Sequence, residues 1–159
     1  MRYRYRDDQN NRVNFGEMDD SFFLIGLLNQ FMNGFQTVGD RFFNEISWKQ
    51  CFVLICIRFF EKPPTLKEVS ELMGSSHQNI KQMLMKLENT GYVAFTPDQS
   101  DKRKQRIVLT EKTQRFMEEN DASSSAFMEK LFWNVGEENL KITVQTILTL
   151  DEQLRRIKI

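Results

Sequence analysis

An amide-rich face on one short segment is the strongest candidate for chemistry in this 159-residue chain. Between residues 76 and 90, apolar residues recur at helical spacing, and the buried face that they predict is Ile80, Met83, Leu84 and Leu87. At about 100° per residue, the opposite face holds Gln78, Gln82, Met85 and Asn89, with Lys81 at its flank. Glutamine and asparagine can bond bidentately to adenine in the major groove, and methionine can press against a thymine methyl. This face therefore predicts contacts with the bases of double-stranded DNA.

The start of the same segment offers groups that bind phosphate. Ser75-Ser76-His77-Gln78 has the form of a capping box, which predicts a helix N-terminus at this point. Serine hydroxyls at a helix N-terminus can donate to a phosphate, and the helix dipole favours the anion. We therefore expect Ser75 and Ser76 to touch the DNA backbone, and His77 to be exposed or near a phosphate.

A basic loop follows the amide-rich segment. The cations expected to contact DNA there are Lys102, Arg103, Lys104 and Arg106. The chain has 22 basic and 22 acidic residues, so this positive charge is local, and the stretch 118–152 is acidic and should face away from DNA. A basic hairpin tip can reach phosphates or insert an arginine into the minor groove. Asp101, two residues before Arg103, is expected to orient its guanidinium.

The helices and strands that position these groups are predicted from the spacing of apolar residues and from residues that begin or end a helix. Capping boxes at Ser47–Gln50 and Thr65–Glu68 open two helices, and Gly74 ends the second of them. The predicted helices are 20–38, 48–60, 66–72, 76–90, 111–133 and 137–157, with strands at 92–96 and 105–109. Two short helices joined by a glycine turn and followed by a hairpin predict a winged helix-turn-helix. The fold class is mainly α with a small β-hairpin (α+β).

The wing motif resembles one known family. Asp98-Gln-Ser-Asp101-Lys-Arg103, then Ile107-Val-Leu-Thr110-Glu-Lys112, is similar to the wing and following helix start of the MarR family of bacterial transcription regulators. Leu87-Glu-Asn-Thr-Gly91-Tyr-Val is similar to the family's junction of recognition helix and wing, whereas Thr113 replaces its usual glycine. The resemblance implies a sequence-specific DNA-binding regulator, expected to be a repressor, that binds a pseudo-palindromic operator with Arg103 in a minor groove.

Apolar residues lie on more than one side of the first helix, which predicts a second partner for it, and that partner could be a second subunit. The resemblance implies a homodimer in which the first and last two helices interlock. We expect a flexible arm at 1–19, dimerisation helices at 20–47 and 111–159, and a DNA-binding lobe at 48–110. The residues expected at the dimer interface are Phe22, Phe23, Leu140, Val144, Ile147 and Leu154.

The resemblance also implies that a small, commonly aromatic effector could bind between the dimer helices and the DNA-binding lobe and release the protein from DNA. The aromatic residues that could line such a pocket, or else simply fill the core and interface, are Phe31, Phe35, Phe42, Trp48 and Phe52.

Cys51 and Cys56 raise a redox-sensing regulator as an alternative. They lie about 140° apart around one helix and should not bond to each other, so we expect both to act as buried hydrophobes.

Other functional classes have little support in the sequence. It has one histidine and no paired ligands at metal spacing, no glycine-rich phosphate loop and no nucleophile with a placed base, so we expect no metal, no cofactor and no enzyme. Without a long apolar stretch or a signal peptide, a cytoplasmic protein away from membranes is expected. The remaining alternative is a winged-helix module that binds a protein instead of DNA, against which the basic loop and the amide face both argue.

Overall fold

The computed structural model describes residues 18–157, which form six helices and one two-stranded hairpin. This confirms the mainly helical α+β fold class. The arm expected over residues 1–19 lies outside the described residues except for Met18 and Asp19. The chain divides into two compact units between Glu111 and Lys112.

The first unit opens with α1 (Asp20–Phe42), a helix capped by Asp19, whose carboxylate accepts a hydrogen bond from the Ser21 amide at 2.9 Å. The helix runs four residues past its predicted end at Val38, because Gly39 lies within it rather than after it. A Cβ at Gly39 would lie 2.8 Å from the Cβ of Trp48. The glycine therefore allows α2 to approach α1 closely.

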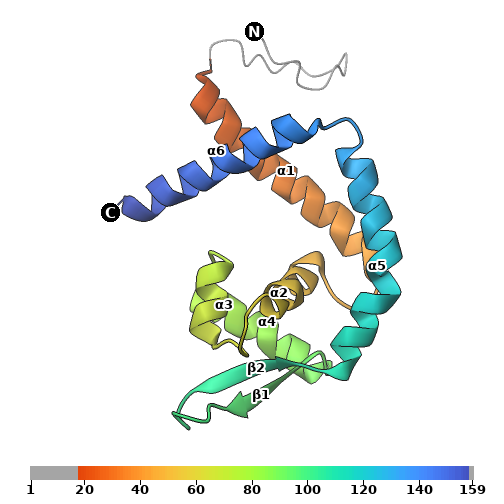
Figure 1. Ribbon diagram of the computed structural model, residues 1–159, viewed down its shortest axis with the longest axis vertical. Helices are drawn as coiled ribbons and strands as arrows, with labels where there is room; N and C mark the ends of the chain where they lie inside the picture. Colours follow the sequence, from red (N-terminus) through yellow and green to blue (C-terminus); the bar gives the residue numbers. More distant parts are fainter. Residues whose placement is uncertain (1–17, 158–159) are drawn as a thin grey trace. The chain divides into compact units, whose positions relative to one another are not determined.

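Three helices make up the helix-turn-helix lobe: α2 (Trp48–Arg58), α3 (Leu66–Leu72) and α4 (His77–Asn89). Both reciprocal hydrogen bonds are present in the predicted capping boxes at Ser47 and Thr65. Helix α2 ends two residues before its predicted end, because the amides of Phe59 and Phe60 turn back to the carbonyls of Cys56 and Ile57. In Figure 1 these helices and the hairpin form one cluster, and α1 leads away from it.

The core of this lobe draws on its three helices and on the hairpin. Its fully buried side chains include Val53 and Leu54 on α2, Val69 on α3, Ile80, Leu84 and Leu87 on α4, and Ile107 on β2. Burying this much apolar surface between short helices stabilises them in a way that their intrinsic propensity alone would not. The core thus fixes which side of α4 faces solvent.

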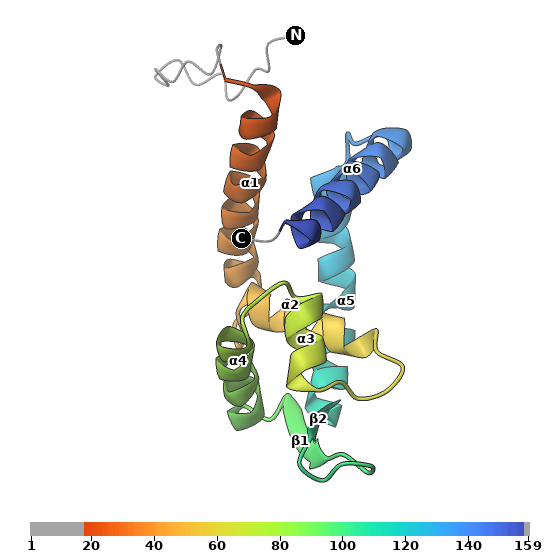
Figure 2. The ribbon, with the colours of Figure 1, turned by 90° about the vertical axis from the view of Figure 1, so that its left-hand side faces the viewer.

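The hairpin follows α4 directly and lies at one end of the lobe (Figure 2). Strands β1 (Val93–Pro97) and β2 (Gln105–Leu109) pair antiparallel, with Val93 opposite Leu109 and Pro97 opposite Gln105. The first strand starts one residue later than predicted, because the Tyr92 amide closes the end of α4 on the Leu87 carbonyl. On the outer edge of β2, the Ile107 amide donates to the Pro64 carbonyl at 2.8 Å, which joins the hairpin to the loop before α3.

The second unit contains α5 (Glu111–Phe132) and α6 (Glu137–Arg156), separated at the break predicted over residues 134–136. No residue described in α6 is buried. Large apolar side chains of this helix are exposed, among them Leu140, Ile142, Val144, Leu148, Leu150 and Leu154. A helix with such a face requires a further surface against which to pack.

Candidate nucleic-acid interface

The core orients α4 as the sequence predicted. Ile80, Leu84 and Leu87 are fully buried, and Met83 is half-buried. The residues expected to read DNA on this helix are all exposed, and they are His77, Gln78, Lys81, Gln82 and Met85. A set of amides and one thioether therefore faces solvent on a helix held rigidly from behind.

The cap of α4 lies one residue later than predicted. The Ser76 hydroxyl accepts a hydrogen bond from the Asn79 amide at 3.3 Å, so Ser76 and not Ser75 is the N-cap. Ser75 is half-buried, and its amide donates to the Ser70 carbonyl at 3.1 Å. That bond closes the turn after α3, in which Gly74 has a φ of 57°, and it leaves Ser76 to begin the helix.

The wing loop is organised around the carboxylate of Asp98, which is buried. One carboxylate oxygen accepts bonds from the Ser100 hydroxyl at 2.6 Å, the Ser100 amide at 2.8 Å and the Asp101 amide at 2.9 Å. The other accepts the Nε–H of Arg106. The Ser100 hydroxyl above all, then Arg106, holds the pKa of Asp98 well below its usual range. Asp98 therefore stays charged and fixes the loop backbone.

Arg106 contacts other protein groups rather than pointing into solvent. Besides Asp98, it donates through Nη1 to the Pro63 carbonyl at 3.1 Å and to Glu68 at 3.3 Å. Its side chain is only 29% exposed, whereas the Lys104 side chain in the same loop is 62% exposed. Arg106 was expected to bind DNA; the structure instead directs its guanidinium into contacts that hold the hairpin, because carboxylates lie on two sides of it.

Asp101 orients backbone rather than the Arg103 side chain. Its carboxylate accepts from the Arg103 amide at 3.1 Å and lies 3.6 Å from the Lys104 ammonium. Within residues 18–157 no hydrogen bond or ion pair joins it to the Arg103 guanidinium, so the expected Asp101–Arg103 side-chain contact is absent there. The Arg103 guanidinium remains available to a ligand.

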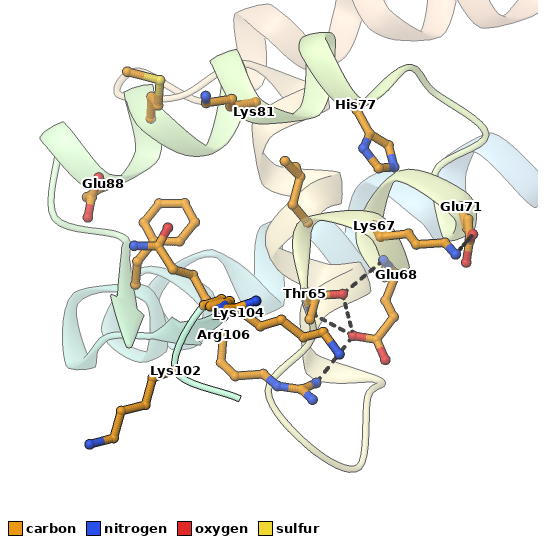
Figure 3. A pocket seen from close by; sticks show the side chains of 15 residues that line it. Thr65, Lys67, Glu68, Glu71, His77, Lys81, Glu88, Lys102, Lys104 and Arg106 are labelled. Carbon is orange, nitrogen blue, oxygen red and sulfur yellow. Dashed lines mark hydrogen bonds and ion pairs between the residues drawn. The ribbon is translucent and has the colours of Figure 1, made fainter. Parts of the chain in front are cut away.

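An open groove of about 870 Å³ lies between α3, α4 and the hairpin (Figure 3). Six cations and three carboxylates line it: Lys67, Lys81, Lys102, Arg103, Lys104, Arg106, Glu68, Glu71 and Glu88. Lys67, Lys104 and Arg106 have carboxylate partners. In the part of the chain that the structure describes, Lys81, Lys102 and Arg103 have none. In Figure 3 the Lys102 side chain points away from the Thr65–Glu68 pair.

Sequence reasoning missed the contribution of α3 to this groove. Lys67 and Glu71 line it from α3, Phe95 lines it from β1, and Glu88 adds a carboxylate at its α4 side. Lys67 and Glu71 pair with each other at 3.7 Å across one helical turn. That i,i+4 spacing was visible in the sequence, but which side of α3 meets α4 depends on how the two helices cross.

Comparison with known proteins supplies the fold family. No protein-family model and no curated protein matches the sequence of this chain. A MarR/EmrR family transcriptional regulator from Acinetobacter sp. ADP1 matches in structure with a TM-score of 0.78 at 15% identity, over 91% of this chain and 100% of that one. This chain has the MarR fold.

Other proteins with the MarR fold match over similar lengths, and two of them have been solved with DNA. FabT of Streptococcus pneumoniae, in complex with DNA, has a TM-score of 0.65 at 20% identity and covers 87% of this chain and 100% of its own. The S. aureus MepR–DNA complex has a TM-score of 0.74 at 14% identity, over 86% and 99%. The MarR fold is therefore one that binds DNA in other proteins.

The two cysteines lie in the core of the lobe. Both are buried and neither forms a disulfide. Burial raises the pKa of the Cys51 thiol to about 11 and also raises the pKa of Cys56. Because the thiolate is the reactive form, both positions are poorly suited to sensing oxidants.

Four of the five aromatic residues that could line an effector pocket form a chain of ring contacts. Phe35 lies edge-on to Trp48 with ring centroids 4.7 Å apart, and Phe31 and Phe52 extend the stack at 5.9 and 6.3 Å. Phe31 and Phe52 are nevertheless 48% and 43% exposed. Packing therefore uses part of this aromatic surface and leaves part of it open.

Two further properties concern residues 18–157 as a whole. None of their helices is long and apolar enough to span a membrane. Their histidine, cysteine, aspartate and glutamate side chains do not gather in any group of three or more that could hold a metal ion.

Proposed function

We propose that this chain is a transcriptional regulator of the MarR type that binds double-stranded DNA in a sequence-specific manner as a homodimer. The observation that carries the proposal is the surface formed by the exposed amides of α4 and the three cations beside it that lack an ion pair in the described residues, Lys81, Lys102 and Arg103. Amides suit base edges, and unpaired cations suit phosphates. The two DNA complexes of proteins with this fold support the same conclusion.

The contacts that we assign differ in kind along this surface. Gln78, Gln82 and Met85 are proposed to touch bases, whereas Ser76, His77 and Lys81 are proposed to touch phosphates near the start of α4. At the wing, Lys102 and Lys104 are proposed to bind phosphates and Arg103 to enter the minor groove. Because Ser75 is half-buried and its amide is used within the turn, we assign it no more than a supporting position.

Two copies of the chain would present this surface twice. Phe22 on α1 is 74% exposed and Leu154 on α6 is 68% exposed, so both helices carry apolar area in need of a partner. A second copy would supply it through the helices within 20–47 and 111–159, leaving 48–110 to bind DNA. Two identical lobes fit a pseudo-palindromic operator, and we propose that the regulator acts as a repressor in the cytoplasm.

The decisive test is selection of bound duplexes from a random pool, followed by affinity measurements against salt. A palindromic consensus with half-sites about one helical turn apart is expected. Arg103→Ala should weaken binding and reduce the slope of log K against log salt by about one. Lys49→Ala is the matched control, because Lys49 is an exposed cation outside the groove, in the first turn of α2, and its loss should leave the slope unchanged.

An absence of salt-dependent binding to any duplex would instead favour a winged-helix module that binds a protein. Equal affinity of Arg103→Ala and the wild type at moderate salt would refute the assignment of the wing tip. Recovery of a consensus without symmetry would contradict the homodimer.

A small aromatic effector is proposed as the regulating ligand, on the strength of the exposed parts of Phe31 and Phe52 beside Trp48. An aromatic compound stacking there should change Trp48 fluorescence in a Trp133→Phe background and lower affinity for the selected duplex. A compound that quenches Trp48 without changing DNA affinity would refute its regulatory role.

A further inference from the structure

A single side chain joins three parts of the DNA-binding lobe. Arg106, on β2, reaches Asp98 at the start of the wing loop, the Pro63 carbonyl before α3, and Glu68 in the first turn of α3. Arg106 forms ion pairs with both carboxylates. The two carboxylates belong to segments 30 residues apart, so Arg106 joins the hairpin to the helix-turn-helix.

Each of these partners already has a local structural role. The Glu68 carboxylate closes the capping box of α3, where it accepts from the Thr65 amide at 2.6 Å and the Thr65 hydroxyl at 2.7 Å. Asp98 organises the wing loop through Ser100 and Asp101. Arg106 therefore connects the group that fixes the start of α3 to the group that fixes the shape of the wing tip. Figure 3 shows the contact between Arg106 and Glu68.

We propose that Arg106 is a positioning residue for DNA binding, which acts through the wing tip by holding Lys102 and Arg103 at a fixed place relative to α4. This proposal rests on the proposed function. Ile107 anchors the base of β2 in the core, but the loop beyond it is exposed and the Asp98–Arg106 contact restrains it. A tip held in place before binding avoids the entropic cost of ordering it on the duplex.

The first experiment needs no DNA. Amide hydrogen exchange is compared between wild type, Arg106→Gln and the control Lys102→Gln, which removes a neighbouring cation without an ion pair in the described residues. In Arg106→Gln the amides of Ser100, Asp101 and Lys104 should exchange at least tenfold faster, while those of Ile80 and Leu84 in the core of α4 should be unchanged. Equal exchange of the loop amides in all three proteins would overturn the proposal that Arg106 restrains the wing loop.

The second experiment is a double-mutant cycle measured on a duplex selected with the wild type. Arg106→Gln alone should weaken binding about tenfold, like the loss of one good contact. In a background that carries both Lys102→Ala and Arg103→Ala the same change should have little further effect, because both groups that it positions are already missing. Additive losses would mean that Arg106 binds phosphate itself and would overturn the proposal.

The conservative variant separates charge from geometry. Arg106→Lys keeps the charge but lacks the planar fork that lets one side chain reach two carboxylates and a carbonyl, so it should bind as poorly as Arg106→Gln. Near wild-type affinity of Arg106→Lys would point to a direct phosphate contact and against positioning. If the wild type binds no duplex while the exchange experiment gives the expected result, the proposed function and the role of Arg106 in DNA binding are both refuted. The restraint of the wing loop by Arg106 would still be shown.

Discussion

Replacing Gly39 by alanine should destabilise this protein, whereas the same change at Gly26 or Gly34 should stabilise it. All three glycines lie in α1. A Cβ at Gly39 would lie 2.8 Å from the Cβ and 2.9 Å from the Cγ of Trp48, whereas a Cβ at Gly26 or Gly34 would meet nothing within 4 Å. The same glycine-to-alanine substitution is therefore expected to lower the free energy of unfolding at one position of α1 and to raise it at two others.

The magnitudes follow from two opposing effects. Alanine is about 1 kcal/mol more favourable than glycine within a helix, so Gly26→Ala and Gly34→Ala should each gain about that much free energy of unfolding. At Gly39 the same gain is opposed by overpacking, which costs about 1–3 kcal/mol. Trp48 cannot simply retreat, since its ring lies edge-on to Phe35 at 4.7 Å and parallel to Phe43 at 6.2 Å.

Gly39→Ala should therefore have a free energy of unfolding about 1–3 kcal/mol below that of Gly26→Ala or Gly34→Ala. For a chain of this size that is a difference of roughly 2–12 °C in melting temperature. Thermal unfolding followed by circular dichroism, at two protein concentrations, measures the difference and separates a subunit-contact effect from a local one. If Gly39→Ala melts as high as Gly26→Ala, close packing of Trp48 against α1 does not limit the size of the side chain at position 39.

Three further predictions concern the subunit contact, the thiols and the wing. Leu154→Glu should convert a dimer into a monomer at micromolar concentration in sedimentation experiments, while Gln153→Glu, which adds the same charge, should not; a monomeric wild type would contradict the architecture. With a pKa of about 11, Cys51 should resist iodoacetamide at pH 8 in the folded protein and react readily in urea, as followed by mass spectrometry, and rapid native labelling would revive the redox alternative. Asp98→Asn should lower the melting temperature most above pH ~4, because a carboxylate with a lowered pKa stabilises the folded state above its unfolded pKa and loses that contribution as pH falls through the folded value; a difference independent of pH would contradict this role for its charge.

Most of the fold could be predicted because local signals were strong. The capping boxes at Ser47 and Thr65 each need only residues three apart, and both formed as expected. The recognition face of α4 followed from the spacing of Ile80, Leu84 and Leu87, since a fully buried stripe leaves no choice about which side faces solvent. The errors at the ends of helices have equally local causes: α1 continues through Gly39 to Phe42, and α2 ends early because the amides of Phe59 and Phe60 turn back to carbonyls within the helix.

The candidate site was predictable only in part, because its arrangement depends on contacts distant in sequence. Arg106 and Arg103 look alike in a basic loop, and only the fold shows that Glu68, 38 residues earlier, pairs with the first and not with the second. Glu68 itself was visible as a capping residue but not as an ion-pair partner.

The contact between Pro64 and β2 also bears on how this protein avoids self-association through its sheet. A two-stranded sheet offers unpaired backbone groups on its outer edges, where strands of other molecules can add. Here the Ile107 amide is already satisfied by the Pro64 carbonyl, and neither Pro63 nor Pro64 has an amide hydrogen to continue a ladder outward. The segment that attaches the wing therefore also ends the sheet on that side, and it prevents strands of other molecules from adding to this edge.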